Sequence, residues 1–173
     1  GLISRFLPFF LLFTTTQCYW SDPPPNDTII FALSSEPKTL DPRYATDASG
    51  QRINQLIFSS LVQIGPDLKM QGNLASSWTY KNLTYVFQLK PGIKFHNGQF
   101  ASAEDFLFSV DEFRKGRSPF AAQFSVIDNA QATYDPEKGG MLKLHFKSYS
   151  APFLQDLPTL KLLPKNEVVT LGE

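Results

Sequence analysis

The stretch "LKPGIKFHNGQFASAEDFLFSV" (residues 89–110) contains the signals that decide the local fold of this 173-residue chain. The segment just before it, "YVFQLK" (residues 85–90), alternates and predicts a strand with Tyr85, Phe87 and Leu89 on one face. The dipeptides "PG" and "NG" then bracket "IKFH" and predict a hairpin-like turn. A Ser followed by two acids comes next, which is a helix N-cap signature. We therefore expect a strand, a turn and a helix in this order.

The same stretch contains groups that catalysis often uses, namely His96, Glu104 and Asp105. We interpret the two carboxylates as first-turn helix acids, because negative charge there stabilises the positive end of the helix dipole. His145 falls on the polar face of the alternating segment "MLKLHFK", far from His96 in the sequence. Two scattered histidines without a cysteine partner lack metal-ligand spacing. No P-loop, G-x-S-x-G or dinucleotide fingerprint is present, so the sequence predicts no catalytic residue and no metal site.

Composition limits the class of protein further. The chain has 16 basic and 16 acidic residues, so it offers no electrostatic argument for binding nucleic acid. Its length suits one domain of ordinary size with a real hydrophobic core.

The N-terminus has a different character. Residues 1–17 carry a single charge and the apolar run "FLPFFLLF" (residues 6–13), which has the length of a signal-peptide core and is too short to span a bilayer. The chain's one cysteine, Cys18, follows directly and resembles the lipidated cysteine of a bacterial lipoprotein. Thr15 and Gln17 depart from that pattern, and an incidental cysteine is the alternative. We expect a signal peptide over 1–17, a lipid anchor at Cys18 and a proline-rich tether over 18–27.

Five segments after the tether have clear patterns. A buried strand is expected at 28–34 ("TIIFALS") and another at 141–147, while Pro152 starts a short helix. Residues 50–61 have apolar positions at helical spacing, as does the segment after Ser102. The residues expected to be buried are Ile53, Leu56, Ile57 and Leu61 in the first helix, Phe106, Val110 and Phe113 in the second, and Leu142, Leu144 and Phe146 in the strand. Strands and helices mix without a βαβ rhythm, which predicts an α+β fold.

Five motifs in order resemble the family 5 extracytoplasmic solute-binding proteins, which are the peptide, dipeptide and nickel receptors of ABC importers. The motifs are "SSEPKTLDP" (34–42), "INQLIFSSLVQIGPDLKMQGNLASSW" (53–78), "LKPGIKFHNGQFASAEDFLFS" (89–109), "SYSAPFLQDLPTLKLLPK" (148–165) and its closing "LPK". Ser59, Ser60 and Gly72 depart from the family pattern on scaffold segments.

The resemblance implies a type II periplasmic-binding-protein fold, of which this chain matches only the N-terminal part. We expect residues 28–45 to begin the first lobe, 46–165 to form the satellite α+β domain and 166–173 to be a truncated continuation. The opposing lobe is then absent from the chain, which would be a fragment.

The resemblance also implies a function. Proteins of this family are not enzymes; they bind a solute, here short peptides, and deliver it to an ABC permease outside the cytoplasmic membrane. Family ligand contacts map onto Thr46, Asp47, Ala48, Ser49 and Phe120. An ordinary polar turn is the alternative for Thr46 and Asp47, and a core aromatic is the alternative for Phe120.

Other functions stay open at this point. The same fold could bind a nickel chelate, haem or a sugar, although the sequence itself points to no cofactor. A periplasmic hydrolase would need His96 to converge with Glu104 or Asp105. The chain could also be the remnant of a disrupted gene that binds nothing.

Overall fold

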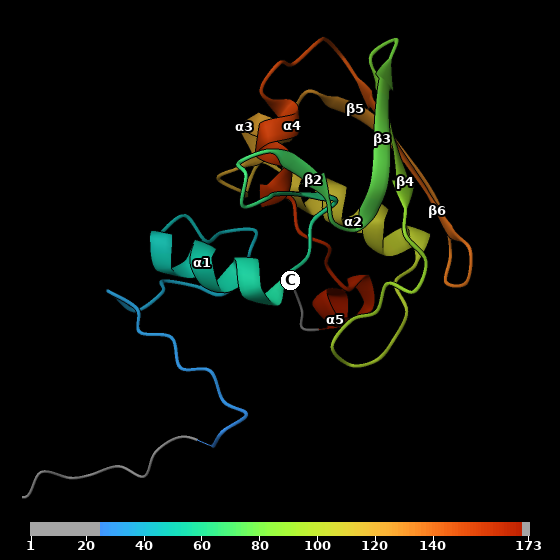
Figure 1. Ribbon diagram of the computed structural model, residues 1–173. Helices are drawn as coiled ribbons and strands as arrows, with labels where there is room; N and C mark the ends of the chain where they lie inside the picture. Colours follow the sequence, from blue (N-terminus) through green and yellow to red (C-terminus); the bar gives the residue numbers. More distant parts are fainter. Residues whose placement is uncertain (1–24, 171–173) are drawn as a thin grey trace, which may run out of the picture. The chain divides into compact units, whose positions relative to one another are not determined.

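The computed structural model describes residues 25–170. The chain divides between Ala32 and Leu33 into two compact units. Within residues 25–170, every helix and strand lies in the second unit (Figure 1). The predicted signal peptide, Cys18 and most of the predicted tether lie outside the described residues.

A four-stranded antiparallel sheet forms the scaffold of the second unit (Figure 1). The strand order is β3 (Ala75–Lys81), β4 (Thr84–Leu89), β6 (Gly139–Phe146) and β5 (Ile127–Asp135). Along the inner strands, Phe87 pairs with Leu142 and Tyr85 with Leu144, so the apolar side chains of β4 and β6 share one face. The predicted alternation in both strands is therefore confirmed.

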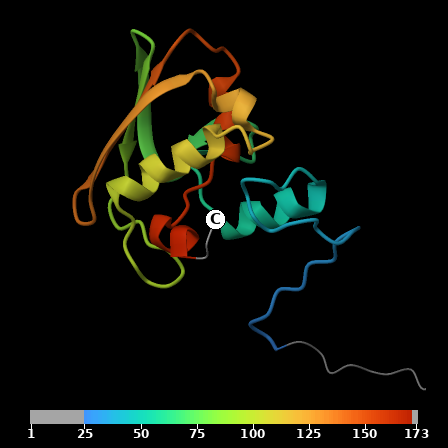
Figure 2. The ribbon, with the colours of Figure 1, turned by 180° about the vertical axis from the view of Figure 1, so that it is seen from behind.

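Helix α2 (Ala103–Arg114) packs against this sheet and makes contact with β5 (Figure 2). The smaller elements surround these two layers. They are α1 (Ala48–Ile57), the hairpin of β1 (Val62–Ile64) and β2 (Met70–Gly72), α3 (Ala121–Phe124), α4 (Phe153–Asp156), the 3₁₀ helix η1 (Leu157–Thr159) and α5 (Lys165–Thr170). The mixture is the α+β fold that the sequence predicts, with the short helix after Pro152 present as α4.

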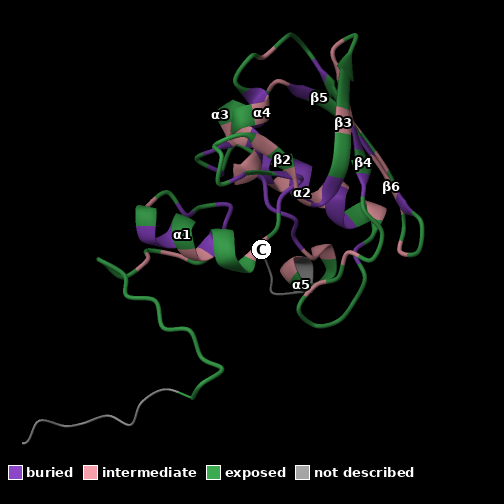
Figure 3. Ribbon diagram, in the orientation of Figure 1, coloured by how far each residue is buried: buried purple, intermediate pink, exposed green. Residues whose placement is uncertain are grey.

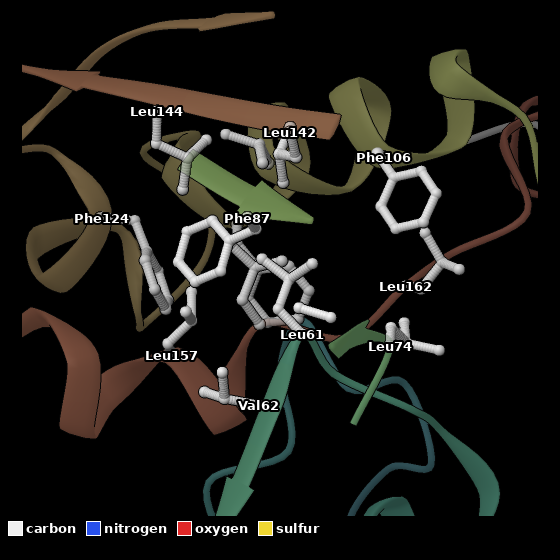
Figure 4. Packing of buried hydrophobic residues seen from close by; sticks show 14 of the residues in the cluster. Leu61, Val62, Leu74, Phe87, Phe106, Phe124, Leu142, Leu144, Leu157 and Leu162 are labelled. Atoms are coloured by element: carbon white, nitrogen blue, oxygen red, sulfur yellow. The ribbon is translucent and has the colours of Figure 1, made fainter. Parts of the chain in front are cut away.

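The core lies between the sheet and α2 (Figure 4). It contains every residue predicted to be buried in α2 and β6: Phe106, Val110, Phe113, Leu142, Leu144 and Phe146. Aromatic rings extend the core. The ring centroids of Phe146 and Phe153 lie 4.5 Å apart in an edge-on pair, and those of Phe124 and Phe113 lie 6.0 Å apart in another. Such aromatic pairs add stability beyond their buried area.

The predicted start of α2 is confirmed as a capping box. The Ser102 Oγ accepts a hydrogen bond from the Asp105 amide, and the Asp105 Oδ2 accepts one from the Ser102 amide at 2.8 Å. The other carboxylate oxygen, Oδ1, accepts from the Lys165 amide at 2.8 Å. Asp105 is therefore a buried structural acid that joins the first turns of α2 and α5.

The predicted buried strand at 28–34 is wrong. No strand forms there, and Ile29 and Ile30 are 81% and 70% exposed (Figure 3). An extended apolar segment becomes a strand only when another strand satisfies its amides and carbonyls. Nothing within residues 25–170 pairs with this one.

The helix predicted over residues 50–61 forms as the shorter α1, and its buried face differs from the prediction. Leu56 is 65% exposed and Ile57 is 40% exposed, whereas Ser49, Gly50 and Asn54 are buried. The helix ends at Ile57, because Phe58 is extended (φ −110°, ψ 139°), and Leu61 joins the core from the following segment. Small and polar residues thus form the contact side of α1.

Several elements had no prediction from the sequence, namely β1, β2, β3, β5, α3 and α5. The β3–β4 hairpin turns at Asn82 and Leu83, both at positive φ, although Leu is uncommon in that conformation. Across residues 25–170, none of the helices combines the length and hydropathy that crossing a bilayer requires.

We predict that Ser102→Ala lowers the free energy of unfolding by about 1 kcal/mol, the usual loss for an N-cap. Asp105→Ala should cost more, about 2–3 kcal/mol, because it leaves the partly buried amides of Ser102 and Lys165 without their acceptor. Glu104→Gln, at the neighbouring exposed acid, is the matched control and should leave the urea midpoint nearly unchanged. An Asp105→Ala variant as stable as the Glu104→Gln variant would contradict the joining role of Asp105.

Candidate functional site

A buried arginine organises the segment that precedes α1. Arg43 is 5% exposed and its guanidinium contacts Asp41 through Nε at 3.0 Å and through Nη2 at 2.6 Å. Its Nη1 reaches Glu112 on α2 at 2.8 Å. Forked pairing of this kind fixes both partners in direction as well as distance. The loop that leads to Thr46 is therefore fastened to α2.

Glu112 completes this network with a second cation. Burial raises the pKa of the Glu112 carboxyl, but hydrogen bonds from Lys115 and Arg43 outweigh it and hold the pKa below its ordinary value. Glu112 is therefore ionised at neutral pH, and the charge of Arg43 is balanced where it is buried.

The four residues predicted to contact a ligand after this loop have different surroundings. Asp47 is the N-cap of α1: its carboxylate accepts from the Gly50 amide at 2.8 Å, which holds the pKa of the Asp47 carboxyl below its ordinary value. Ser49 is buried, with its hydroxyl 3.0 Å from that of Ser35. Thr46 and Ala48 are exposed. Two of the four side chains thus have structural partners, and two face outward.

Phe120, the fifth predicted contact, is 9% exposed and belongs to the core cluster. Its ring lies 6.4 Å from that of Phe113, and its amide donates to the Ser118 hydroxyl. The core-aromatic alternative therefore describes the ring, which also lines a cavity.

That cavity has a volume of about 440 Å³ and lies between α1, the 58–64 segment and the 155–161 segment. Residues of the Thr46–Ser49 turn do not line it. Six of its 15 lining residues carry a side-chain amide, and Lys161 is the one ionisable residue among them. The lining residues are Pro42, Ala45, Gln51, Asn54, Gln55, Phe58, Ser60, Gln63, Ile64, Asn73, Phe120, Gln155, Pro158, Thr159 and Lys161. Sequence analysis did not single out Lys161 or Asn54.

Lys161 is an unusual wall residue because it is 8% exposed. Its backbone bridges to Ser60, and the next residue, Leu162, donates its amide to Ser59 at 2.9 Å. Leu160 and Leu162 join the core, so the extended backbone turns Lys161 to the opposite side, into the cavity. The one signal in the sequence is a lysine inside the apolar run "TLKLL".

The two acids that a hydrolase would use, Glu104 and Asp105, both have structural partners. Glu104 pairs with Lys165 at 2.6 Å, and Asp105 is engaged by backbone amides. Among residues 25–170 no cluster of three or more His, Cys, Asp or Glu side chains could hold a metal ion.

The chain is similar in sequence and in structure to known proteins. The family model for the bacterial extracellular solute-binding proteins, family 5 (middle region), matches residues 69–166, more than half of the chain. The chain belongs to this family. The match includes the capped helix α2, the whole four-stranded sheet and Lys161, and it leaves out α1 and β1.

Individual family 5 proteins cover more of the chain. The glutathione-binding protein GsiB of Pectobacterium atrosepticum is 28% identical over 124 residues, which are 69% of this chain and 24% of that protein. The structure of NikZ from Campylobacter jejuni with Ni(L-His) superposes with a TM-score of 0.71 at 27% identity, covering 83% of this chain and 28% of NikZ. The periplasmic murein tripeptide-binding protein MppA of Escherichia coli gives 0.70 at 20% identity, covering 82% and 31%.

The chain therefore spans a quarter or less of the length of the curated relatives that it matches. The fold is that of part of a family 5 periplasmic binding protein, as the sequence predicts, and the relatives are solute-binding proteins.

Lys161 gives a test of this site through stability. Burial lowers the pKa of the Lys161 ammonium from 10.5 to about 8, and no other ionisable side chain lines the cavity. In the unfolded chain the group stays charged up to its ordinary pKa. The penalty on folding is therefore complete below pH 8 and is relieved as the pH rises from 8 toward 10.5.

We predict that Lys161→Met raises the free energy of unfolding at pH 7 by up to about 3 kcal/mol, and that this gain shrinks at pH 10. Urea unfolding at the two pH values measures it. Lys143→Met, on the exposed face of β6, is the matched control and should show no pH-dependent gain. A Lys161→Met variant that is less stable than the parent at pH 7 would contradict the buried, unbalanced charge.

Proposed function

We propose that this chain is part of the solute-binding component of an ABC importer that captures short peptides outside the cytoplasmic membrane and delivers them to a permease. The observation that carries the proposal is the family match over residues 69–166. The similarity to a glutathione-binding protein supports a peptide as the solute, since glutathione is itself a small peptide. A nickel chelate is the second candidate, because the chain is 27% identical to a protein solved with Ni(L-His).

The proposed contact surface is the Thr46–Ser49 turn together with Phe120. The Arg43 network fastens the turn to α2, and Asp47 and Ser49 are held by hydrogen bonds, so the turn is preorganised. Thr46 and Ala48 are exposed and available to an extended peptide. Such a surface covers one face of a peptide, and the other face keeps its hydrogen bonds to water.

The chain performs no reaction in this proposal. Glu104 and Asp105, the acids that a hydrolase would need, are engaged in the ion pair with Lys165 and in the capping box. The protein acts in the periplasm or at the cell surface, in line with the periplasmic relatives, and Cys18 attaches it to the membrane through a lipid.

For peptide binding we predict weak and local contacts. Trialanine titrated into the purified chain should shift the amide resonances of residues 46–49 with a millimolar Kd, about −4 kcal/mol, because only one face of the peptide is desolvated. Thr46→Glu should weaken this binding, whereas Thr79→Glu, at an exposed position on β3, is the matched control.

Three results would contradict the proposal in different ways. Micromolar binding of trialanine would show that a complete site lies within this chain. Shifts with Ni(L-His) but not with trialanine would favour the nickel chelate. Cleavage of trialanine during the titration, followed by mass spectrometry, would favour the hydrolase.

For the membrane anchor we predict that the chain expressed in a bacterium incorporates labelled fatty acid and that Cys18→Ser abolishes the label. The thiol is the acceptor that lipoprotein processing requires, and a serine hydroxyl does not replace it. Ser21→Ala, three residues later, is the matched control and should keep the label. Equal labelling of the Cys18→Ser variant would end the lipoprotein proposal.

A further inference from the structure

Lys161 has a fixed place in the wall of the cavity beside α1. Its backbone bridges to Ser60, and Leu160 and Leu162 on either side of it belong to the core. The side chain is 8% exposed, and within residues 25–170 its ammonium group makes no hydrogen bond or ion pair. Lysine side chains are almost never buried unless they are paired, so this one has an unusual environment.

The amine of Lys161 is nevertheless within reach of a solute. Among the side chains of residues 25–170 that are not exposed, Asn54 Oδ1 is the one nitrogen or oxygen that lacks both a hydrogen-bond partner and accessible surface. The Lys161 Nζ also lacks a partner, so it retains accessible surface, and the residue lines the half-open cavity. The volume of about 440 Å³ falls within the usual range of small-molecule sites, roughly 300–1,000 Å³. A small molecule in the cavity can therefore touch the amine.

The surroundings of Lys161 favour its neutral, nucleophilic form. The lining residues from α1, the 58–64 segment and the 155–161 segment present no acid and no second base to it. Burial lowers the pKa of the Lys161 ammonium from 10.5 to about 8. About a tenth of this amine is then neutral at pH 7, against about one part in 3,000 for a lysine with the ordinary pKa. A desolvated lysine of this kind is the usual form of an amine that attacks carbonyl compounds.

The cavity wall also limits the chemistry that the amine can perform. No other ionisable side chain lines the cavity, so no acid or base stands ready to assist a poor leaving group. An aldehyde needs no such assistance to react with a neutral amine. The side-chain amides of the wall, such as those of Gln55 and Gln155, can hydrogen-bond the oxygen atoms of a small polar aldehyde.

We propose that Lys161 is a covalent modification site for small aldehydes, which enter the cavity and condense with its amine. The lone pair of the neutral Nζ attacks the aldehyde carbon and forms a carbon–nitrogen bond. The carbonyl oxygen then leaves as water, together with the two hydrogen atoms of the amine, and an imine remains. The step consumes no oxidant or reductant and is reversible.

This site is separate from the peptide contacts proposed above. Residues 46–49 do not line the cavity, and only Phe120 belongs to both. The two proposals therefore fail separately: trialanine tests the turn, and an aldehyde tests Lys161.

The test uses the purified chain with DL-glyceraldehyde and sodium cyanoborohydride, which reduces each imine to a stable secondary amine. After a short reaction at pH 7, chymotryptic peptides are mapped by mass spectrometry. Lys161 should be modified at least ten times as fast as Lys143, which lies on the exposed face of β6. The α-amino group of the chain, with an ordinary pKa near 8, also reacts, and its peptide is mapped separately.

Two changes of condition show whether the fold causes this preference. At pH 10 the ratio should fall severalfold, because an ordinary lysine becomes largely neutral there while Lys161 is already neutral above pH 8. In concentrated urea at pH 7 the two lysines should react alike. Lys161→Met should remove the label from its own peptide only, and Lys143→Met is the matched control. The proposal is overturned if Lys161 in the folded chain reacts no faster than Lys143 at pH 7, or if its preference persists in urea.

Discussion

The carboxylate of Asp105 is the contact on which the arrangement of this domain depends. One oxygen closes the capping box of α2 and the other accepts the first amide of α5, so a single buried side chain fixes two helix starts. One turn later, Ser109 repeats the arrangement: its hydroxyl donates to the Asp105 carbonyl and accepts from the Leu163 amide at 2.8 Å. A polar stripe on α2 thus holds the 160–165 segment in an extended conformation against the core.

The hydrogen bonds that hold this segment also determine which of its side chains line the neighbouring cavity. The Leu163 amide is bonded to Ser109 on α2 and the Leu162 amide to the Ser59 carbonyl, and the leucines at 160, 162 and 163 all belong to the core. Leu160 and Leu162 take the core side, where Leu162 lies beside Phe106 (Figure 4), and Lys161 has only the cavity side left. Lys161 is therefore buried because of its position in this paired segment, and not because lysine prefers a buried environment.

Features that depend on neighbouring residues in the sequence could be predicted, whereas features that depend on contacts between distant segments could not. The capped start of α2 and the alternation in β4 and β6 were predictable, because spacing along the chain produces them. The segment 28–34 has equally good strand residues, but a strand also requires a partner. The face of α1 could not be predicted either: Asn54 and Gly50 are buried because the Arg43 loop and the cavity wall lie against them, while Leu56 points outward. Lys161 and Asn54 could be singled out only from the structure, which shows that both side chains are buried.

The fold also buries two polar groups that have no partner among the described residues, the Lys161 ammonium group and Asn54 Oδ1. Natural domains remove buried charges that have no use, since replacement by an apolar residue of similar size commonly stabilises the fold. Lys161 and Asn54 lie on segments brought together only by the fold, and both lack complementary partners in the same space. Burial of the Lys161 ammonium group and of the unpaired Asn54 Oδ1 therefore lowers the stability of the domain, and contacts between distant segments hold both groups in place.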